Sequence, residues 1–173
     1  MTDPINTADF ERWLTGARAG LVKMADSIVK DEHEAEDVVQ DTLEAVWREY
    51  AGGNVGSLRA YAARAVWLNA LKRRSRLRRH EPLDAEALRS RGIPEPAHVP
   101  DEDRELTGWE LERAIGGLPS RQQAVIRLRF YGGMNFREIG RALSISMNTA
   151  ASSCRYALAA LRNALQISHD KEQ

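Results

Sequence analysis

Polar side chains of the kinds that bind nucleic acid cluster between positions 148 and 156 of this sequence. They are Asn148, Thr149, Ser152, Ser153, Arg155 and Tyr156. An arginine can donate two hydrogen bonds to one guanine edge, and asparagine, serine and threonine can contact bases or phosphates. Upstream, Arg137 and Arg141 are about one helical turn apart, a spacing that suits phosphate binding. These residue types therefore indicate DNA recognition.

Patterns that indicate catalysis or metal binding are missing from the sequence. It contains no Ser/His/Asp constellation, no P-loop and no metal-ligand spacing, and its histidines are scattered at His33, His80, His98 and His169. Its single cysteine, Cys154, cannot form an internal disulfide, and its helical phase predicts a small core residue rather than a nucleophile. We therefore expect a protein that is not an enzyme and that uses no cofactor or metal.

Two predicted helices would position the polar cluster. Asn135 and Glu138 have the spacing of a capping box, and Ser146 is a candidate cap for a second helix. Apolar residues recur with the helical period in both segments: Phe136, Ile139 and Leu143, then Ala150, Cys154, Ala157, Leu161 and Leu165. Joined by a turn at 144–146, they predict a helix-turn-helix, whose second helix can enter a major groove. An ordinary helical hairpin within a bundle is the alternative.

Two more helices are predicted before this pair, at 106–115 and 118–131, each followed by a pair of glycines that would end it. Ser120 and Gln123 have the spacing of a second capping box. The residues predicted to pack inward from the second of these helices are Ala124, Val125, Leu128 and Tyr131. The segment 105–168 therefore predicts a small helical domain that ends in the helix-turn-helix.

An acidic helix is predicted at 34–50, where the helical period is clearest. Its apolar side consists of Ala35, Val38, Val39, Thr42, Leu43, Val46, Trp47 and Tyr50. Its opposite side consists of Glu34, Asp37, Gln40, Asp41, Glu44 and Arg48. An acidic face of this length is either a solvated surface or a docking surface for a basic partner.

A basic helix is predicted at 58–79, after a glycine-rich loop at 51–57. Its positive residues are Arg59, Arg64, Lys72, Arg73, Arg74, Arg76, Arg78 and Arg79, and its predicted inward stripe is Leu58, Tyr61, Ala62, Ala65, Leu68 and Asn69. Cations at this density neutralise phosphates and give affinity that falls with salt, unless the run is only a solvated helix end. Trp67 could stack on an unpaired base or belong to the core.

The whole chain is predicted to be all-α, with two helical domains at 5–80 and 105–168. Between them, residues 81–104 form a Pro-rich acidic linker, because prolines disfavour helix and remove backbone donors. Total charge does not discriminate between partners, since 25 Lys and Arg balance 25 Asp and Glu. With no signal peptide and no apolar run near ~18 residues, we expect a cytoplasmic protein that is not inserted in a membrane.

Two stretches resemble the bacterial RNA polymerase sigma factors of the extracytoplasmic-function (ECF) type, in the sigma-70 family. Glu34-Ala-Glu-Asp-Val-Val-Gln-Asp-Thr42, followed by Val46-Trp47-Arg48, is similar to the helix that binds core polymerase in this family. Leu118-Pro-Ser-Arg-Gln-Gln-Ala-Val-Ile-Arg-Leu-Arg-Phe-Tyr131, with Phe136-Arg-Glu-Ile139 and Ile145-Ser146, is similar to its promoter-binding region. The resemblance covers nearly the whole chain and implies a factor that recognises and melts promoter DNA.

The resemblance also implies roles for particular residues. Those that would bind the core polymerase are Asp37, Gln40, Asp41 and Glu44. Those in the region 2-like domain that would recognise the −10 promoter element are Asn54, Arg64, Trp67, Lys72, Arg73, Arg74 and Arg76. Those in the region 4-like domain that would bind the −35 element are Arg137, Arg141, Asn148, Thr149, Ser152, Ser153, Arg155 and Tyr156. An anti-sigma factor that holds the two domains together is a further expected partner.

Two other functions remain open from the sequence. A sigma mimic would bind an anti-sigma factor without productive promoter contact, an interpretation favoured by Ala151 and Ser153 where the family usually has basic residues. A stand-alone helix-turn-helix repressor would bind duplex DNA by itself, often as a dimer. The acidic helix and the basic N-terminal half would be superfluous in such a repressor.

Overall fold

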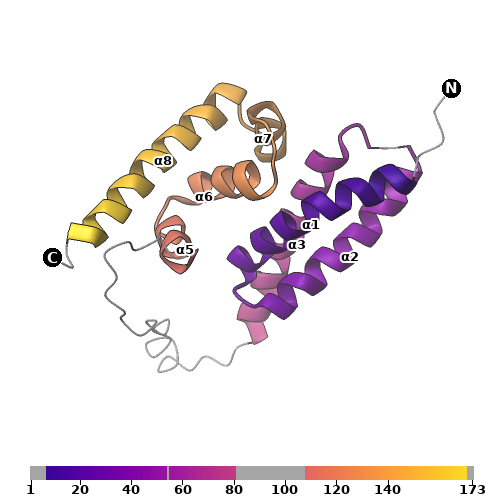
Figure 1. Cartoon of the computed structure of the whole chain (residues 1–173), viewed down its shortest axis with the longest axis horizontal. Coiled ribbons are helices and arrows are strands. Elements are labelled where there is room, and N and C mark those ends of the chain that lie inside the picture. The colour runs from indigo at the N-terminus through magenta and orange to yellow at the C-terminus, as the bar shows by residue number, and fades with distance from the viewer. Residues whose placement is uncertain (1–6, 54, 81–107, 171–173) are drawn as a thin grey trace.

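The computed structural model describes residues 7–53, 55–80 and 108–170, and within these ranges every regular element is helical. The elements in chain order are α1 (Thr7–Val29), α2 (Glu32–Ala51), α3 (Leu58–His80), α5 (Gly108–Gly116), α6 (Ser120–Ile126), the π-helix η1 (Arg127–Tyr131), α7 (Phe136–Leu143) and α8 (Met147–Asp170). They form an N-terminal unit of α1–α3 and a C-terminal unit of α5–α8 (Figure 1). The all-α prediction is confirmed, and the predicted linker at 81–104 lies outside the described residues.

In the N-terminal unit, α2 has the orientation that its sequence predicts. Its inward residues Ala35, Val38, Val39, Thr42, Leu43 and Val46 are all buried. Trp47 and Tyr50 are half-buried and lie against Phe10 of α1, with the Trp47 and Phe10 ring centroids 4.9 Å apart in an edge-to-face arrangement. The helix begins at Asp31, whose side chain accepts a hydrogen bond from the Glu34 amide. The cap at Asp31 and the burial of the apolar side therefore both stabilise α2 as a helix.

The predicted inward stripe of α3 was only partly right: Ala62 is buried and Leu58 and Ala65 pack against the core, but the other buried residues were missed. The buried residues of this helix are Ala62, Ala63, Val66 and Ala70, whereas Tyr61 is 42% exposed. Three of the four buried side chains are alanines, which a pattern based on large apolar residues does not detect. They are buried because α3 packs against α1 and α2 and also against η1 of the C-terminal unit.

The C-terminal unit differs from prediction at the start of α6. Pro119, not Ser120, occupies the cap position, and no side chain caps this end of the helix. Gln123 instead donates hydrogen bonds to the carbonyl oxygens of Gly116 (3.0 Å) and Leu118 (2.8 Å). The predicted capping box is therefore wrong, since Gln123 is used to hold the preceding turn.

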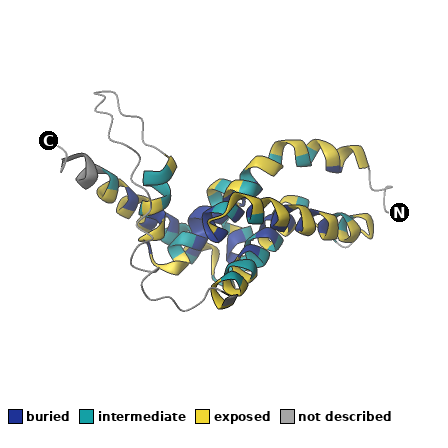
Figure 2. Cartoon of the chain, turned by 90° about the horizontal axis from the view of Figure 1, so that it is seen from below, coloured by how far each residue is buried: buried dark blue, intermediate teal, exposed yellow. Residues whose placement is uncertain are grey.

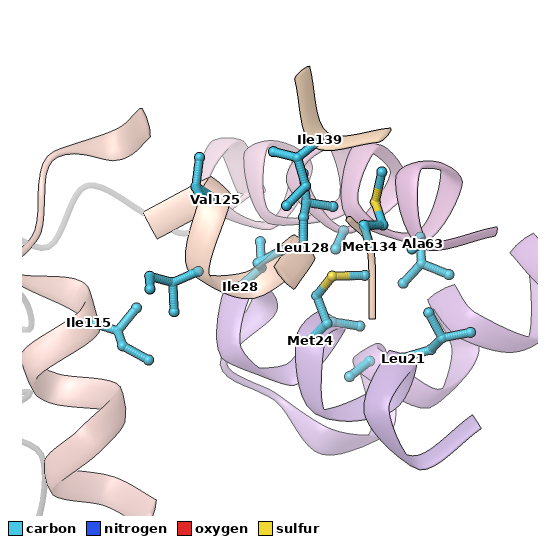
Figure 3. Close-up of a cluster of buried hydrophobic side chains, with 14 of the residues drawn as sticks. Leu21, Met24, Ile28, Ala63, Ile115, Val125, Leu128, Met134 and Ile139 are labelled. Carbon is cyan, nitrogen blue, oxygen red and sulfur yellow. The ribbon is translucent and has the colours of Figure 1, made fainter. Parts of the chain in front are cut away.

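The two units share one hydrophobic core. Leu21, Met24 and Ile28 of α1 and Ala63 of α3 belong to the same buried cluster as Val125, Leu128, Met134 and Ile139 of the C-terminal unit (Figure 3). Buried residues accordingly concentrate where the units meet (Figure 2). Each fully buried large apolar side chain stabilises the fold by about 1.5–3 kcal/mol. The units are therefore packed together rather than held only by the chain between them.

Candidate nucleic-acid interface

The helix-turn-helix forms with the caps that the sequence predicts. The Asn135 side chain accepts a hydrogen bond from the Glu138 amide (2.9 Å), and the Glu138 carboxylate accepts one from the Asn135 amide (2.8 Å). At the start of α8, the Ser146 hydroxyl accepts a hydrogen bond from the Thr149 amide (3.0 Å). Both predicted helix starts are confirmed, and each satisfies a backbone donor that the helix cannot pair internally.

The turn between α7 and α8 is tight. Ser144 ends α7 in the left-handed conformation, with φ of 56°. A Cβ atom at Gly140 would lie 2.8 Å from the carbonyl oxygen of Ile145 and 3.3 Å from the Met147 amide nitrogen. Only glycine therefore allows the turn to cross this closely over α7.

The start of α8 presents several of the predicted DNA-binding residues to solvent. Its inward residues Ala150, Cys154, Ala157 and Leu161 are buried. The exposed members of the predicted set are Asn148, Arg155 and Tyr156, and the half-buried members are Thr149, Ser152 and Ser153. Arg137 and Arg141 are exposed on α7. The helix-turn-helix thus brings the whole predicted −35 set onto α7 and the first turns of α8.

Local hydrogen bonds separate the side chains that are free to read bases from those that hold the helix. The Thr149 and Ser146 hydroxyls are 2.8 Å apart and share a hydrogen bond. The Ser152 hydroxyl donates to the carbonyl oxygens of Asn148 (2.9 Å) and Thr149 (3.1 Å). Arg155, in contrast, extends from the helix, with its guanidinium carbon 5.7 Å from the centre of the Tyr156 ring. Asn148, Arg155 and Tyr156 are therefore the most accessible candidates for base contacts.

The positive residues of α3 are not equivalent. Arg64, Lys72 and Arg76 are exposed. Arg73 is half-buried and forms an ion pair with Glu34 of α2, which raises the pKa of its guanidinium. Arg74 is also half-buried, and burial together with nearby cations lowers its pKa. Arg73 thus connects α3 to α2 as well as contributing positive charge.

Trp67 and Asn54 are two other residues that were predicted to contact the −10 element. Trp67 is half-buried and packs against the shared core, so only part of its ring is open to a base. Asn54 lies outside the described residues. The neighbouring Asn69 donates a hydrogen bond to the Thr42 hydroxyl (3.0 Å), which connects α3 to α2. The accessible part of this surface therefore consists mainly of arginine and lysine side chains.

A second surface, acidic in character, lies on α2. Asp37, Gln40, Asp41 and Glu44 are all exposed, on the side of the helix opposite its buried residues. Their spacing of three and four residues places them in one stripe along two turns. We call these four residues the α2 stripe. It provides a negatively charged surface, and Asp37 and Asp41 lie near enough to Arg73 of α3 to add to the effect of Glu34 in raising the pKa of that guanidinium.

Sequence analysis missed a polar cluster where the two units meet. Arg127 of η1 is only 6% exposed, and its Nε donates to the Ser27 hydroxyl of α1 (2.7 Å). Its Nη1 donates to Gln123 (2.9 Å). Glu112 of α5 accepts a hydrogen bond from the Tyr131 hydroxyl through Oε1. Its buried Oε2 makes no hydrogen bond and instead lies 3.6 Å from both Arg127 Nη2 and Lys30 Nζ.

Burial governs the electrostatics of this cluster. It lowers the pKa of Arg127, although the Glu112 carboxylate opposes the shift. Burial and the hydrogen bond to Glu112 both raise the pKa of the Tyr131 hydroxyl, so it stays protonated. The available sequence signal was the presence of Arg127 inside the apolar run Val125–Leu128. An arginine there predicts a buried partner, but its identity cannot be inferred from the run itself.

A second polar contact connects the units beside the helix-turn-helix. Glu138 accepts hydrogen bonds from Arg59 Nη2 (3.2 and 3.3 Å) and from the Ser57 hydroxyl (3.2 Å). Burial alone would raise the pKa of Glu138, but the Asn135 amide, Arg59 and Ser57 together hold it below its usual value. Glu138 thus caps α7 and also binds the start of α3.

Neither a metal site nor a membrane span is found in the part of the chain that the structure describes. No group of His, Cys, Asp and Glu side chains there is arranged to hold a metal ion. None of the helices there combines the length and apolar character that crossing a membrane requires.

Comparisons with known proteins match both units. Residues 17–80 match the family described as Sigma-70 region 2, and residues 114–163 match Sigma-70, region 4. ECF RNA polymerase sigma factor SigL of Mycobacterium tuberculosis is 30% identical over 150 residues, which cover 86% of this chain and 84% of SigL. ECF RNA polymerase sigma factor SigE of Mycolicibacterium smegmatis is 26% identical over 136 residues; this match covers 76% of this chain but only 52% of SigE.

Solved structures show the same arrangement of helices. The sigma factor RpoE from Bartonella quintana, solved in complex with the anti-sigma factor NepR, gives a TM-score of 0.64 at 25% identity and covers 92% of this chain and 98% of RpoE. CnrH, solved in complex with the cytosolic domain of CnrY, gives a TM-score of 0.60 at 22% identity and covers 94% of this chain and 90% of CnrH. At that identity, the similarity to CnrH concerns the fold alone.

Proposed function

This chain belongs to the ECF sigma factors of the sigma-70 family, and we propose that it directs promoter-specific transcription initiation together with bacterial core RNA polymerase. The observation that carries the proposal is the presence of two exposed surfaces of different character. The α2 stripe presents carboxylates to solvent, whereas α3 and the start of α8 present cations and polar side chains. A factor that joins a protein machine to DNA needs both kinds of surface on one chain.

Each unit takes one part of this function. The N-terminal domain, 5–80, docks on the polymerase through the α2 stripe. It recognises and melts the −10 element through its 51–57 loop, with Asn54, and through α3. The C-terminal domain, 105–168, places α8 in the major groove of the −35 element, with Arg137 and Arg141 on flanking phosphates. Residues 81–104 are the proposed linker that joins the two domains along the chain.

The proposed activity is binding rather than catalysis. The factor lowers the cost of opening DNA by holding the separated strand, so no cofactor or metal is required. It acts in the cytoplasm, where the polymerase is. An anti-sigma factor is its proposed regulator, in line with the complex in which RpoE was solved with the anti-sigma factor NepR.

Run-off transcription with purified core polymerase tests the function. A template pool of genomic fragments should yield discrete transcripts that require both the core enzyme and this protein. A sigma mimic that only binds an anti-sigma factor would give none. A stand-alone repressor would bind duplex DNA tightly without the core enzyme. Either of these two results would contradict the proposal.

Replacing Arg155 with alanine should weaken recognition of the −35 element at one base pair. The loss of a bidentate contact with a base is expected to cost about 1–3 kcal/mol in promoter binding and to relax the preference at that position. Arg162→Ala is the matched control, because Arg162 is also exposed on α8 but lies two turns further along. Holoenzyme binding to a set of single-base promoter variants measures both effects. An equal loss on every variant would assign Arg155 to phosphate contact instead.

Replacing Arg64 and Lys72 together with alanine should weaken binding to all promoters alike. Both side chains are exposed, and removing each phosphate interaction should make the dependence of log K on log salt shallower by roughly 0.7–0.9. Arg73→Ala is the contrasting variant, since it breaks the ion pair with Glu34 and should also lower thermal stability. Filter binding by the holoenzyme over a salt series checks the prediction. A loss confined to certain sequences would contradict it.

A further inference from the structure

A groove lies between α1, η1 and the start of α3. Its volume is about 540 Å³, within the range of about 300–1,000 Å³ that small-molecule sites usually have. Trp13 of α1 and Phe130 of η1 line it, as do Arg12 of α1 and Arg59 at the start of α3. None of the residues that line it belongs to the sets expected to bind core polymerase or promoter DNA. The groove is therefore a surface to which the proposed function gives no role.

Glycines leave room for this groove. Gly16 and Gly20 are about one turn apart on α1, and the turn after η1 contributes Gly132 and Gly133. A Cβ atom at Gly16 would meet nothing within 4 Å, so the space beside this residue is open. At Gly20, in contrast, a Cβ atom would lie 2.6 Å from the carbonyl oxygen of Tyr131, so α1 and η1 are in direct contact there. The groove is thus lined partly by bare backbone, and a side chain at position 16 would occupy part of it.

Aromatic side chains give the groove its apolar character. Phe130 is 57% exposed, so much of its ring is in contact with water. Trp13 is half-buried, and its ring centroid lies 5.7 Å from that of Phe10, a contact that helps to hold the indole in place. Ala17 and Leu21 add aliphatic surface. Short π-helical segments such as η1 are frequent at functional sites, and covering the two exposed rings with an apolar ligand is favourable.

The charged groups at the groove are cations. Among the described residues that line it, Arg12 and Arg59 are charged and none is acidic. Arg12 Nη1 lies 3.1 Å from Asp9, and both side chains are exposed. Arg59 bonds Glu138 through Nη2, while its guanidinium carries further N–H donors on Nε and Nη1. Exposed ion pairs of this kind contribute little to stability, so the anionic group of a ligand can share or replace these carboxylates.

The polar groups at the groove define the chemistry of the ligand. The Tyr131 hydroxyl is bonded to Glu112. Among the described residues that line the groove, no side chain is an amide, a carboxylate or an aliphatic hydroxyl, the groups that bind sugar hydroxyls and base edges. A guanidinium instead matches a carboxylate, because its planar fork can donate two parallel hydrogen bonds. These features favour a ligand with one carboxylate and an apolar body.

We propose that this groove binds a small amphipathic carboxylate, whose apolar body covers Trp13 and Phe130 and whose carboxylate pairs with Arg12 and Arg59. The ligand excludes water from the two rings and brings negative charge to a surface that carries only cations among its described lining residues. Binding requires neither core polymerase nor DNA, so the proposal stands independently of the proposed function.

A titration of the full chain with octanoate, followed by two-dimensional amide NMR spectra, tests the site. Saturable shifts should centre on the amides of Gly16, Gly20 and Gly132 and on the indole signal of Trp13, which line the groove. Octan-1-ol lacks the charge and acetate lacks the apolar body, so each should bind several-fold more weakly than octanoate. Absence of saturable shifts, shifts centred outside the groove, or equal affinity for octan-1-ol would overturn the proposal.

Filling the groove is the second test. Gly16→Leu places a side chain in the open space, and leucine also favours the helix more than glycine does, so the fold should be kept. Ala19→Leu is the matched control, because it puts the same side chain at an exposed position of α1 that does not line the groove. Octanoate affinity should fall by about ten-fold or more in Gly16→Leu and stay within about two-fold in Ala19→Leu. Unchanged affinity in Gly16→Leu, or an equal loss in both variants, would overturn the proposal.

Removing one cation is the third test and requires no change to the shape of the groove. Arg12→Gln should weaken octanoate binding several-fold and leave octan-1-ol binding unchanged, because only the first ligand carries a charge. Arg18→Gln is the control, since Arg18 is exposed on the same helix but does not line the groove. Equal octanoate affinity in Arg12→Gln and the parent protein would overturn the assigned position of the carboxylate, as would an equal loss in Arg18→Gln.

Discussion

Reversing the charge of Asp37 and Asp41 together, by lysine substitution, is expected to abolish binding to core RNA polymerase. Both carboxylates are exposed on the outer side of α2, so the substitutions need not disturb the core. The proposed partner surface is basic, and placing two cations against it replaces attraction with repulsion worth several kcal/mol. Since each 1.4 kcal/mol is a factor of ten, the expected loss of affinity is at least about 100-fold.

The measurement needs a control for charge alone. The control is Glu11→Lys, which makes the same change of charge at an exposed site on α1, away from the α2 stripe. It is compared with the single variant Asp41→Lys. Surface plasmon resonance with immobilised core enzyme should show a large loss for Asp41→Lys and little change for Glu11→Lys. Circular dichroism should show the same helix content in both. Unaltered affinity in the double variant would remove α2 as the docking helix.

Removing Arg127 is expected to destabilise the protein far more than removing an exposed arginine of α6. Its buried guanidinium donates hydrogen bonds to Ser27 and Gln123. It also lies 3.6 Å from the Glu112 carboxylate and balances part of the negative charge of that group. Arg127→Ala removes one partner from each of these groups in a site that excludes water, which costs about 3 kcal/mol in the free energy of unfolding. For a chain of this size the melting temperature should fall by about 6–12 °C.

Two comparisons isolate the cause of this destabilisation. Arg121→Ala removes an arginine that is exposed on α6 and should leave the melting temperature within about a degree. Arg127→Lys keeps the charge but not the planar fork of donors, so it should recover only part of the stability. Differential scanning calorimetry gives the values. A melting temperature for Arg127→Ala equal to that of the parent would show that the polar cluster contributes little to the packing of the two units.

Elements with local signals were predictable from the sequence. The Asn135 and Glu138 capping box and the Ser146 cap connect residues only three positions apart, and both formed as expected. The helical period of α2 was also sufficient to predict its buried side, because large apolar side chains such as Val39 and Leu43 recur along that side. The predicted binding residues on α2 and α8 followed from the same phase, since the side of a helix opposite its buried residues is exposed.

Elements without large apolar side chains were harder to predict. The buried side of α3 is made of Ala62, Ala63, Val66 and Ala70, and small residues carry little hydrophobic signal. The Ser120 and Gln123 pair had the right spacing for a capping box, but Gln123 found carbonyl acceptors in the preceding turn. In both cases the outcome depended on the elements that pack around the helix. The spacing of residues within the helix carries no information about those neighbours.

The sequence by itself determined the all-α class, the starts of α7 and α8 and the exposed side of α2, because each depends on residues within a few turns of one another. Tertiary structure alone decided which cations face solvent and which, like Arg73, are paired within the bundle. It also decided that the two units share a core, since Ser27 and Arg127 are 100 positions apart and no local pattern relates them. Contacts between residues so far apart in the sequence depend on how the folded helices fit together. The close approach of Gly20 in α1 to the carbonyl oxygen of Tyr131 in η1 is another such contact.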